Sequence, residues 1–150
     1  MIFLQLNLYL TLNYLCAMMD DYITKEVSKT RAAVESVLKR LSQLSGKAAS
    51  AEIHDYVKTE MSGKLGLDID SILSKDDFIS TLVSKFHFDN DDLNRFAEIL
   101  YTMLKADEGK DEVHNAYARA IVKINKWLEE KGITFSATRH YVLEDMNRYF

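Results

Sequence analysis

DLNRFAEILYTMLKADEGKDEVHNAYARAIVKINKWLEEK, residues Asp92–Lys131, is the stretch that decides the fold. Apolar residues recur in it at three- and four-residue steps on either side of a polar break, Asp107–Asp111. They are Leu93, Phe96, Ala97, Leu100 and Leu104 before the break, and Val113, Tyr117, Ala120, Ile124 and Trp127 after it. This spacing places one apolar stripe on each of two helices. Because the break is short, we predict an antiparallel helical hairpin.

The composition extends this prediction to the whole chain. With 150 residues, 47% of them hydrophobic and 28% charged, the chain suits one globular core. It has no proline and five glycines, which favours helices joined by short links. We predict an all-α fold, a six-helix bundle of αα-hairpins. The predicted helices are Asp21–Ser45, Ser50–Leu65, one that follows a cap at Ser74 and carries Phe78 to Phe86, the two helices of the hairpin, and Ala137–Tyr149.

Two helix starts have recognisable caps. Asp20 or Asp21 can accept the free N–H groups at the start of the first helix. Asp89 and Asp92 have the spacing of a capping box and open the hairpin.

The segment Met1–Met18 has a different pattern. Its leucines stand at every second position from Leu4 to Leu12, a period typical of a strand, yet no later segment offers a matching strand. It is too short and too polar for a membrane span of about 20 apolar residues. We rank an upstream extension from a misassigned start first, a disordered or loosely docked arm second, and a membrane anchor third. We therefore divide the chain into an extension, residues 1–18, and a single helical domain, residues 19–150.

The first predicted helix carries a heptad seam. Its apolar positions are Ile23, Val27, Thr30, Val34, Val37, Leu41 and Leu44, spaced alternately by four and three residues. Two interpretations stay open. The seam packs against later helices of its own chain, which we favour, or Ile23 to Leu41 form a homodimer seam across a two-fold axis.

Composition and motifs exclude several classes of function. A net charge of −4 without a basic stripe argues against a nucleic-acid partner. One cysteine, Cys16, forbids an internal disulfide and fits a reducing, cytoplasmic location. The four histidines lack metal-binding spacing, and no nucleophile elbow, phosphate-binding loop or dinucleotide fingerprint occurs. We predict no catalytic residue, no metal and no cofactor.

Aromatic side chains near the hairpin are the candidates for partner binding. Core packing explains most of them, but any that remain exposed in a groove would suit a peptide. We assign a candidate partner groove to Tyr101, Tyr117, Trp127, His140 and Tyr141.

The hairpin resembles one degenerate tetratricopeptide repeat. Leu100, Leu104, Tyr117 and Ala120 suit the repeat pattern, whereas Ala97, Tyr101 and Val113 depart from it. Residues 21–150 are similar to a family of uncharacterised bacterial helical proteins, some of them labelled tetratricopeptide-like. The segments that carry this similarity are Asp21-Tyr22-Ile23, Leu65-Gly66-Leu67-Asp68-Ile69-Asp70, Asp76-Asp77-Phe78, and Thr134-Phe135-Ser136 with Arg139. The resemblance implies an all-α fold and no established activity.

Taken together, these patterns favour a non-enzymatic helical module that binds a protein or peptide, or a second copy of itself. The alternative is a helical small-ligand binder or enzyme whose carboxylates and histidines gather only in the fold. Finding His54, His114 or His140 with acidic residues in one pocket would favour that alternative.

Overall fold

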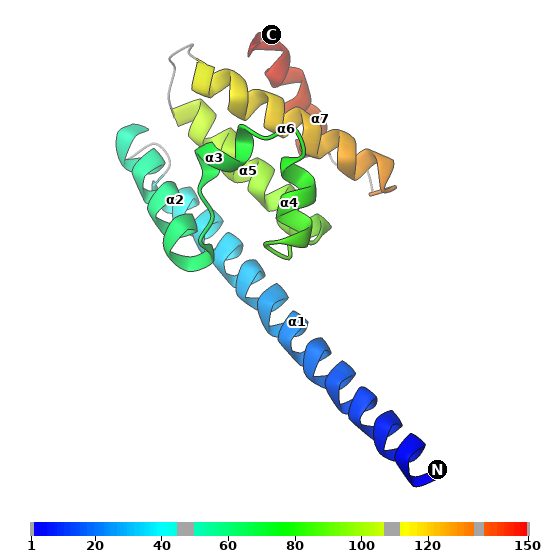
Figure 1. Ribbon diagram of the computed structural model, residues 1–150. Coiled ribbons are helices and arrows are strands. Elements are labelled where there is room, and N and C mark those ends of the chain that lie inside the picture. Colours follow the sequence, from blue (N-terminus) through cyan, green and yellow to red (C-terminus); the bar gives the residue numbers. More distant parts are fainter. Residues whose placement is uncertain (1, 45–49, 107–111, 134–136, 150) are drawn as a thin grey trace.

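Helices account for almost all of the described chain, residues 2–44, 50–106, 112–133 and 137–149 of this computed structural model (Figure 1). They are α1 (Ile2–Leu44), α2 (Ser50–Leu65), α3 (Ile69–Leu73), α4 (Phe78–Ser84), α5 (Asn90–Ala106), α6 (Glu112–Glu130), α7 (Ala137–Met146) and the 3₁₀-helix η1 (Asn147–Tyr149). No strand occurs within these ranges, which confirms the all-α class.

The predicted count of six helices is wrong, because a short helix, α3, stands between α2 and α4. The Asp68 carboxylate caps it by accepting a hydrogen bond from the Ser71 N–H at 3.2 Å. Ser74, predicted to cap the next helix, closes α3 instead.

The predicted hairpin is formed by α5 and α6, which lie side by side (Figure 1). Its joint, residues 107–111, and the side chain of Val113 lie outside the described residues. The stripe of α5 is buried, and so are the α6 residues Tyr117, Ala120 and Ile124. Trp127 is half-buried at the edge of the core. The spacing of the stripes therefore predicted the packing of this pair correctly.

Helix α5 is the centre of the core. It contacts α6 on one side and α1 and α2 on another, while α7 packs against α6. Phe88, just before α5, meets Phe96 edge to face with ring centroids 5.7 Å apart. On α7, Val142 and Met146 are buried against the same core.

Helix α1 differs most from the prediction. It runs unbroken from Ile2 to Leu44, across the proposed boundary after Met18, so Asp21 lies within the helix rather than at its start. The strand-like alternation is helical here. A lone strand would leave its backbone groups unpaired, whereas a helix pairs them internally, and leucine favours helices. At about 1.5 Å per residue its length is roughly 65 Å.

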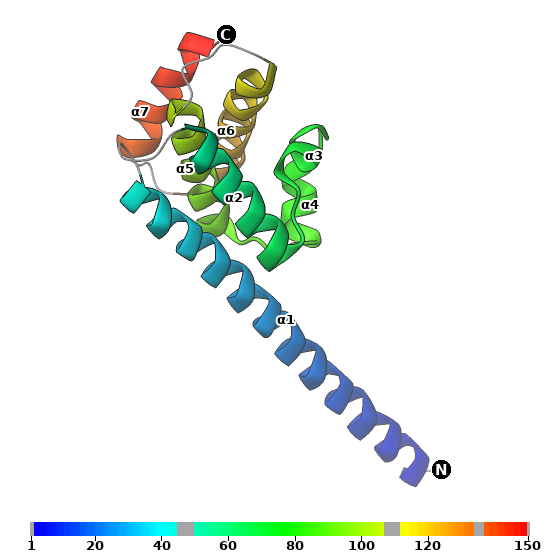
Figure 2. The ribbon, with the colours of Figure 1, turned by 90° about the vertical axis from the view of Figure 1, so that its left-hand side faces the viewer.

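The N-terminal half of α1 projects away from the other helices (Figures 1 and 2). We call residues 2–26 the arm and residues 30–149 the body. Large apolar side chains of the arm are at least 45% exposed: Leu8, Tyr9, Leu10, Leu12, Tyr14, Leu15, Met18, Met19, Tyr22 and Ile23. Among the described residues, no helix combines the length and the apolar character that crossing a membrane requires.

The heptad seam of α1 divides at Val27. Thr30, Val34, Val37 and Leu41 are buried within the chain's own fold, where α1 contacts α2 and α5. Packing within the chain therefore accounts for these four positions. Val27 is half-buried and Ile23 is exposed, so the seam continues out of the core onto the arm.

We expect Leu100→Ala to lower the free energy of unfolding by about 3 kcal/mol, because Leu100 is fully buried and its truncation leaves a cavity in the core. Urea titration followed by the fluorescence of Trp127, the single tryptophan, measures this. The matched control, Leu10→Ala on the exposed arm, should change the same quantity by less than about 0.5 kcal/mol. Equal losses in both variants would contradict the assignment of the core.

Candidate functional site

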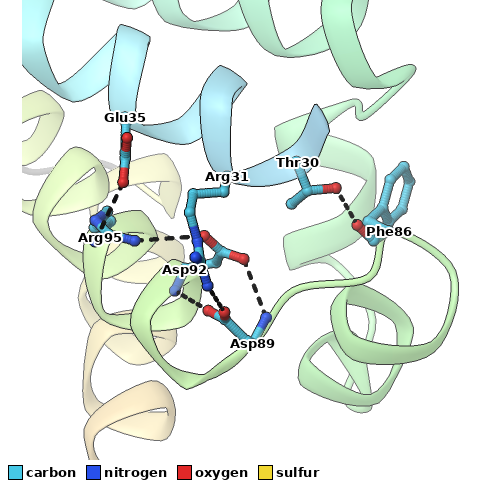
Figure 3. Close-up of polar contacts among 7 residues, drawn as sticks. All are labelled: Thr30, Arg31, Glu35, Phe86, Asp89, Asp92 and Arg95. Atoms are coloured by element: carbon cyan, nitrogen blue, oxygen red, sulfur yellow. Dashed lines mark hydrogen bonds and ion pairs between the residues drawn. The ribbon is translucent and has the colours of Figure 1, made fainter. Parts of the chain in front are cut away.

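Five charged side chains meet where α1 crosses the start of α5 (Figure 3). We call them the junction cluster: Arg31 and Glu35 of α1, with Asp89, Asp92 and Arg95 at the start of α5. The Asp92 N–H donates to the Asp89 carboxylate at 2.8 Å, and the Asp89 N–H donates to the Asp92 carboxylate at 3.1 Å. This reciprocal pair confirms the predicted capping box.

The two arginines tie the capping box to α1. Arg31 donates to the Asp89 carboxylate. Arg95 lies between two carboxylates, with Nη2 3.4 Å from Glu35 Oε1 and Nη1 3.6 Å from Asp92 Oδ1. Nearby, the Thr30 hydroxyl donates to the Phe86 carbonyl oxygen at 2.6 Å. These contacts hold α1 against α5 at the point where the arm leaves the body.

Burial makes the junction cluster sensitive to pH. Burial raises the pKa of the Asp92 carboxyl to about 6, and the negative charge of Asp89 adds to this rise, while the hydrogen bond from the Asp89 N–H opposes it. Burial also acts to raise the pKa of Asp89, but hydrogen bonds from the Asp92 N–H and from Arg31 outweigh it and leave that pKa lowered. The two carboxylates therefore differ in their preferred protonation state.

A groove of about 500 Å³ lies next to the cluster, between α1 and α5. Its lining residues are Glu35, Leu38, Lys39, Leu41, Ser42, Arg95, Glu98 and Thr102. Burial raises the pKa of the Glu98 carboxyl. Nη1 of Arg95 is buried and makes no hydrogen bond to the described residues. The groove thus offers two cations and two carboxylates, a set suited to holding a small polar molecule rather than to covalent chemistry.

The residues of the candidate partner groove do not line one surface. Tyr117 is buried; its hydroxyl is 3.3 Å from Asp70 Oδ1, and its ring stacks on His54 with centroids 6.0 Å apart. Tyr101 is half-buried and donates to Asp145 of α7 at 2.9 Å. Tyr117 therefore faces α2 and α3, while Tyr101 faces α7.

Of the other members of the candidate partner groove, His140 and Tyr141 lie at the surface and Trp127 is half-buried at the edge of the core. The Trp127 ring carries the Lys131 ammonium 4.5 Å from its centroid. His140 is exposed, with Nε2 3.0 Å from Glu144 Oε1, and Tyr141 is also exposed. Of the five residues, Tyr141 presents the largest aromatic surface to a partner.

The described histidines lie on separate elements. The Nε2 atom of His54, on α2, is 3.0 Å from the Met103 carbonyl oxygen, whereas His87 lies in the joint before α5 and His140 on α7. The side chain of His114 lies outside the described residues. Within the described part of the chain, no three His, Cys, Asp or Glu residues gather in a way that could hold a metal ion.

Comparison with known proteins adds no family to these observations. No protein-family model, curated protein or solved structure matches the chain. The tetratricopeptide-like and bacterial-family resemblances therefore stay predictions, and the all-α class rests on the helices themselves.

The sequence predicts the capping box but not the other contacts of the junction cluster. Arg31 and Asp89 are 58 residues apart in the chain, and no local pattern joins them. One signal was available: Arg31 and Glu35 stand one turn apart beside the seam, the position for charges that flank a helix–helix contact.

We expect Asp92→Asn to make stability less dependent on pH. The raised pKa means that the folded protein holds the Asp92 proton more tightly than the unfolded chain, so wild type loses stability as pH rises through about 6. The difference in free energy of unfolding, wild type minus variant, should fall by about 2 kcal/mol between pH 4 and pH 8. Urea titrations across this range measure it.

Asp91→Asn is the matched control, because this side chain lies in the same turn but is exposed. It should leave the pH dependence of the wild type unchanged. A constant difference between wild type and Asp92→Asn at all pH values would contradict the prediction.

Proposed function

We propose that this protein is a non-enzymatic interaction or scaffold module, and that the arm is the surface through which it binds another protein chain. The supporting observation is the exposure of ten large apolar side chains along one projecting helix. A helix that is apolar on all sides is normally buried, and large exposed apolar patches mark interaction sites. No charged residue occurs from Met1 to Met19, so the partner surface should also be apolar.

The polar groups of the body support the same proposal, because the side chains best suited to catalysis or ligand binding already make structural contacts. His54 contacts a backbone carbonyl, and Asp89 and Asp92 cap α5. On the ground of its single cysteine, we propose that the module acts in a reducing compartment, the cytoplasm.

The α1–α5 groove favours a second candidate function, the binding of a small polar ligand. Its volume lies within the usual range for such sites, about 300–1,000 Å³. A small molecule that raises the midpoint of thermal unfolding of wild type, but not of Arg95→Leu, would support this candidate.

Photo-crosslinking tests the proposed interaction surface. We expect benzoylphenylalanine in place of Tyr14, on the arm, to give discrete protein adducts in cells that express the chain. The same substitution at Tyr141 is the matched control, because the two tyrosines are 66% and 65% exposed. Denaturing gels and mass spectrometry identify the adducts.

Adducts at Tyr14 and none at Tyr141 would support the arm as the surface. Adducts only at Tyr141 would place the interaction surface on α7 instead. Absence of adducts at both positions would contradict an interaction module.

A further inference from the structure

The seam that α1 buries in the body continues along the same face of the arm. We call the part before Thr30, which is exposed except for the half-buried Val27, the arm seam: Tyr9, Leu12, Cys16, Met19, Ile23 and Val27. Successive members are three or four residues apart, and Val27 leads at the same spacing to Thr30, the first buried position. The exposed fraction falls from 45% at Ile23 to 2% at Thr30. From Thr30 onward this face is therefore buried where α1 contacts α2 and α5, whereas its positions before Val27 are exposed.

We propose that the arm seam pairs with the arm seam of a second copy of this chain, the two α1 helices running antiparallel. This inference rests on the proposed function and names its partner. It commits to a closed, two-fold symmetric dimer in which each arm lies along the other.

Self-complementarity supports a second copy as the occupant. A two-fold interface requires that each residue of the surface meet another residue of the same surface. In antiparallel register Leu12 lies opposite Ile23 and Cys16 opposite Met19, since each pair of numbers adds to 35. Tyr9 then lies opposite Val27, because their numbers add to 36, which is a shift of only one residue from the same register. Every member of the arm seam thus finds an apolar partner, and the larger ring faces the smaller side chain.

The position of the body decides the direction of pairing. From Thr30 onward α2 and α5 pack on the face of α1 that carries the seam. A parallel partner helix in register would have to enter that occupied space beyond Val27. An antiparallel partner avoids most of this space, because its Tyr9 comes opposite Val27 and only its residues 2–8 extend past that point. Its own body begins opposite the first few residues of the first arm.

The charges beside the arm argue against a lipid surface as the occupant. Asp20 and Asp21 follow the uncharged stretch directly. Segments that bind anionic lipid carry Lys or Arg at this position, because cations are attracted to the headgroups. Pairing with a second copy requires no Lys or Arg at this position. In the antiparallel arrangement the uncharged part of each arm lies along the part of the other arm that carries Asp20 and Asp21.

Sedimentation equilibrium tests the pairing. We expect a mass twice the 17.3 kDa of one chain at micromolar concentration. Leu12→Asp should weaken the dimer by roughly 100-fold or more in Kd, because it buries an unpaired charge at the seam. Leu10→Asp, the matched control on the opposite face of the same helix, should change the Kd by less than about tenfold. The Trp127 unfolding midpoint of both variants, measured at dilutions where wild type is monomeric, should equal that of wild type, because the arm lies outside the core.

Disulfide cross-linking tests the direction. Under a mild oxidant, Met19→Cys with Cys16 retained should form cross-linked dimers much faster than wild type, because each Cys16 then faces a cysteine of the other chain. Replacing Cys16 with alanine in that variant should slow the reaction again. Rapid cross-linking of wild type through Cys16 alone would overturn the antiparallel arrangement.

A chain that stays monomeric up to about 100 μM, far above the Kd of a specific dimer, would overturn the pairing. In that case Tyr14 adducts with a different protein would retain the proposed function and reject only the second copy. Wild type that instead sediments with vesicles of phosphatidylcholine and phosphatidylglycerol, with Leu12→Asp left in solution, would assign the arm to lipid.

Discussion

The burial of α5 is the constraint on which the rest of the structure depends. Within its 17 residues, Leu93, Phe96, Ile99, Leu100, Met103 and Leu104 are fully buried. One neighbouring helix covers only one stripe of another, so α5 needs α6 on one side and α1 and α2 on the other. The second half of α1 is thereby committed to the core. Because α1 is one continuous helix, its first half must project in the direction that this packing sets.

The junction cluster fixes that direction with polar contacts. Apolar side chains alone would allow α1 to slide or rotate on α5, because dispersion and burial are not directional. Arg31 of α1 binds the Asp89 carboxylate just before α5, and Glu35 of α1 binds Arg95 within α5. The cost is the burial of the Asp92 carboxylate, which shows in its raised pKa. Part of the folding free energy is therefore spent on the register between two helices.

The body and the arm differ in how far their side chains are already engaged in contacts. Polar groups in the body are engaged in caps, ion pairs and backbone contacts, whereas the apolar surface of the arm has no described neighbour. Apolar residues at three- and four-residue steps run along one face through both halves of α1. This face packs against α2 and α5 inside the chain and, in the arrangement proposed above, against an identical helix of another chain. The same apolar face of α1 would thus stabilise the fold in the body and the dimer in the arm.

The sequence by itself determined the elements whose signals are local. The stripes of α5 and α6, the capping box at Asp89 and Asp92 and the bounds of α2 follow from side-chain spacing within one or two turns, where periodicity and propensity act. The alternation from Leu4 to Leu12 misled for the same reason: a period of two indicates a strand only where a second strand can pair with it. The residues of one segment do not show whether a second strand is present elsewhere in the chain to pair with it.

Only the tertiary structure decided which apolar positions are buried and which polar groups meet. Val37 and Ile23 occupy equivalent positions of one seam, two heptads apart, yet Val37 is buried and Ile23 is exposed. Tyr117 belongs to the core rather than to a groove because α2 and α3 close over it. Arg31 reaches Asp89 across 58 residues of chain. Burial and ion pairing depend on segments far apart in the chain, and spacing along one helix does not encode where those segments will pack.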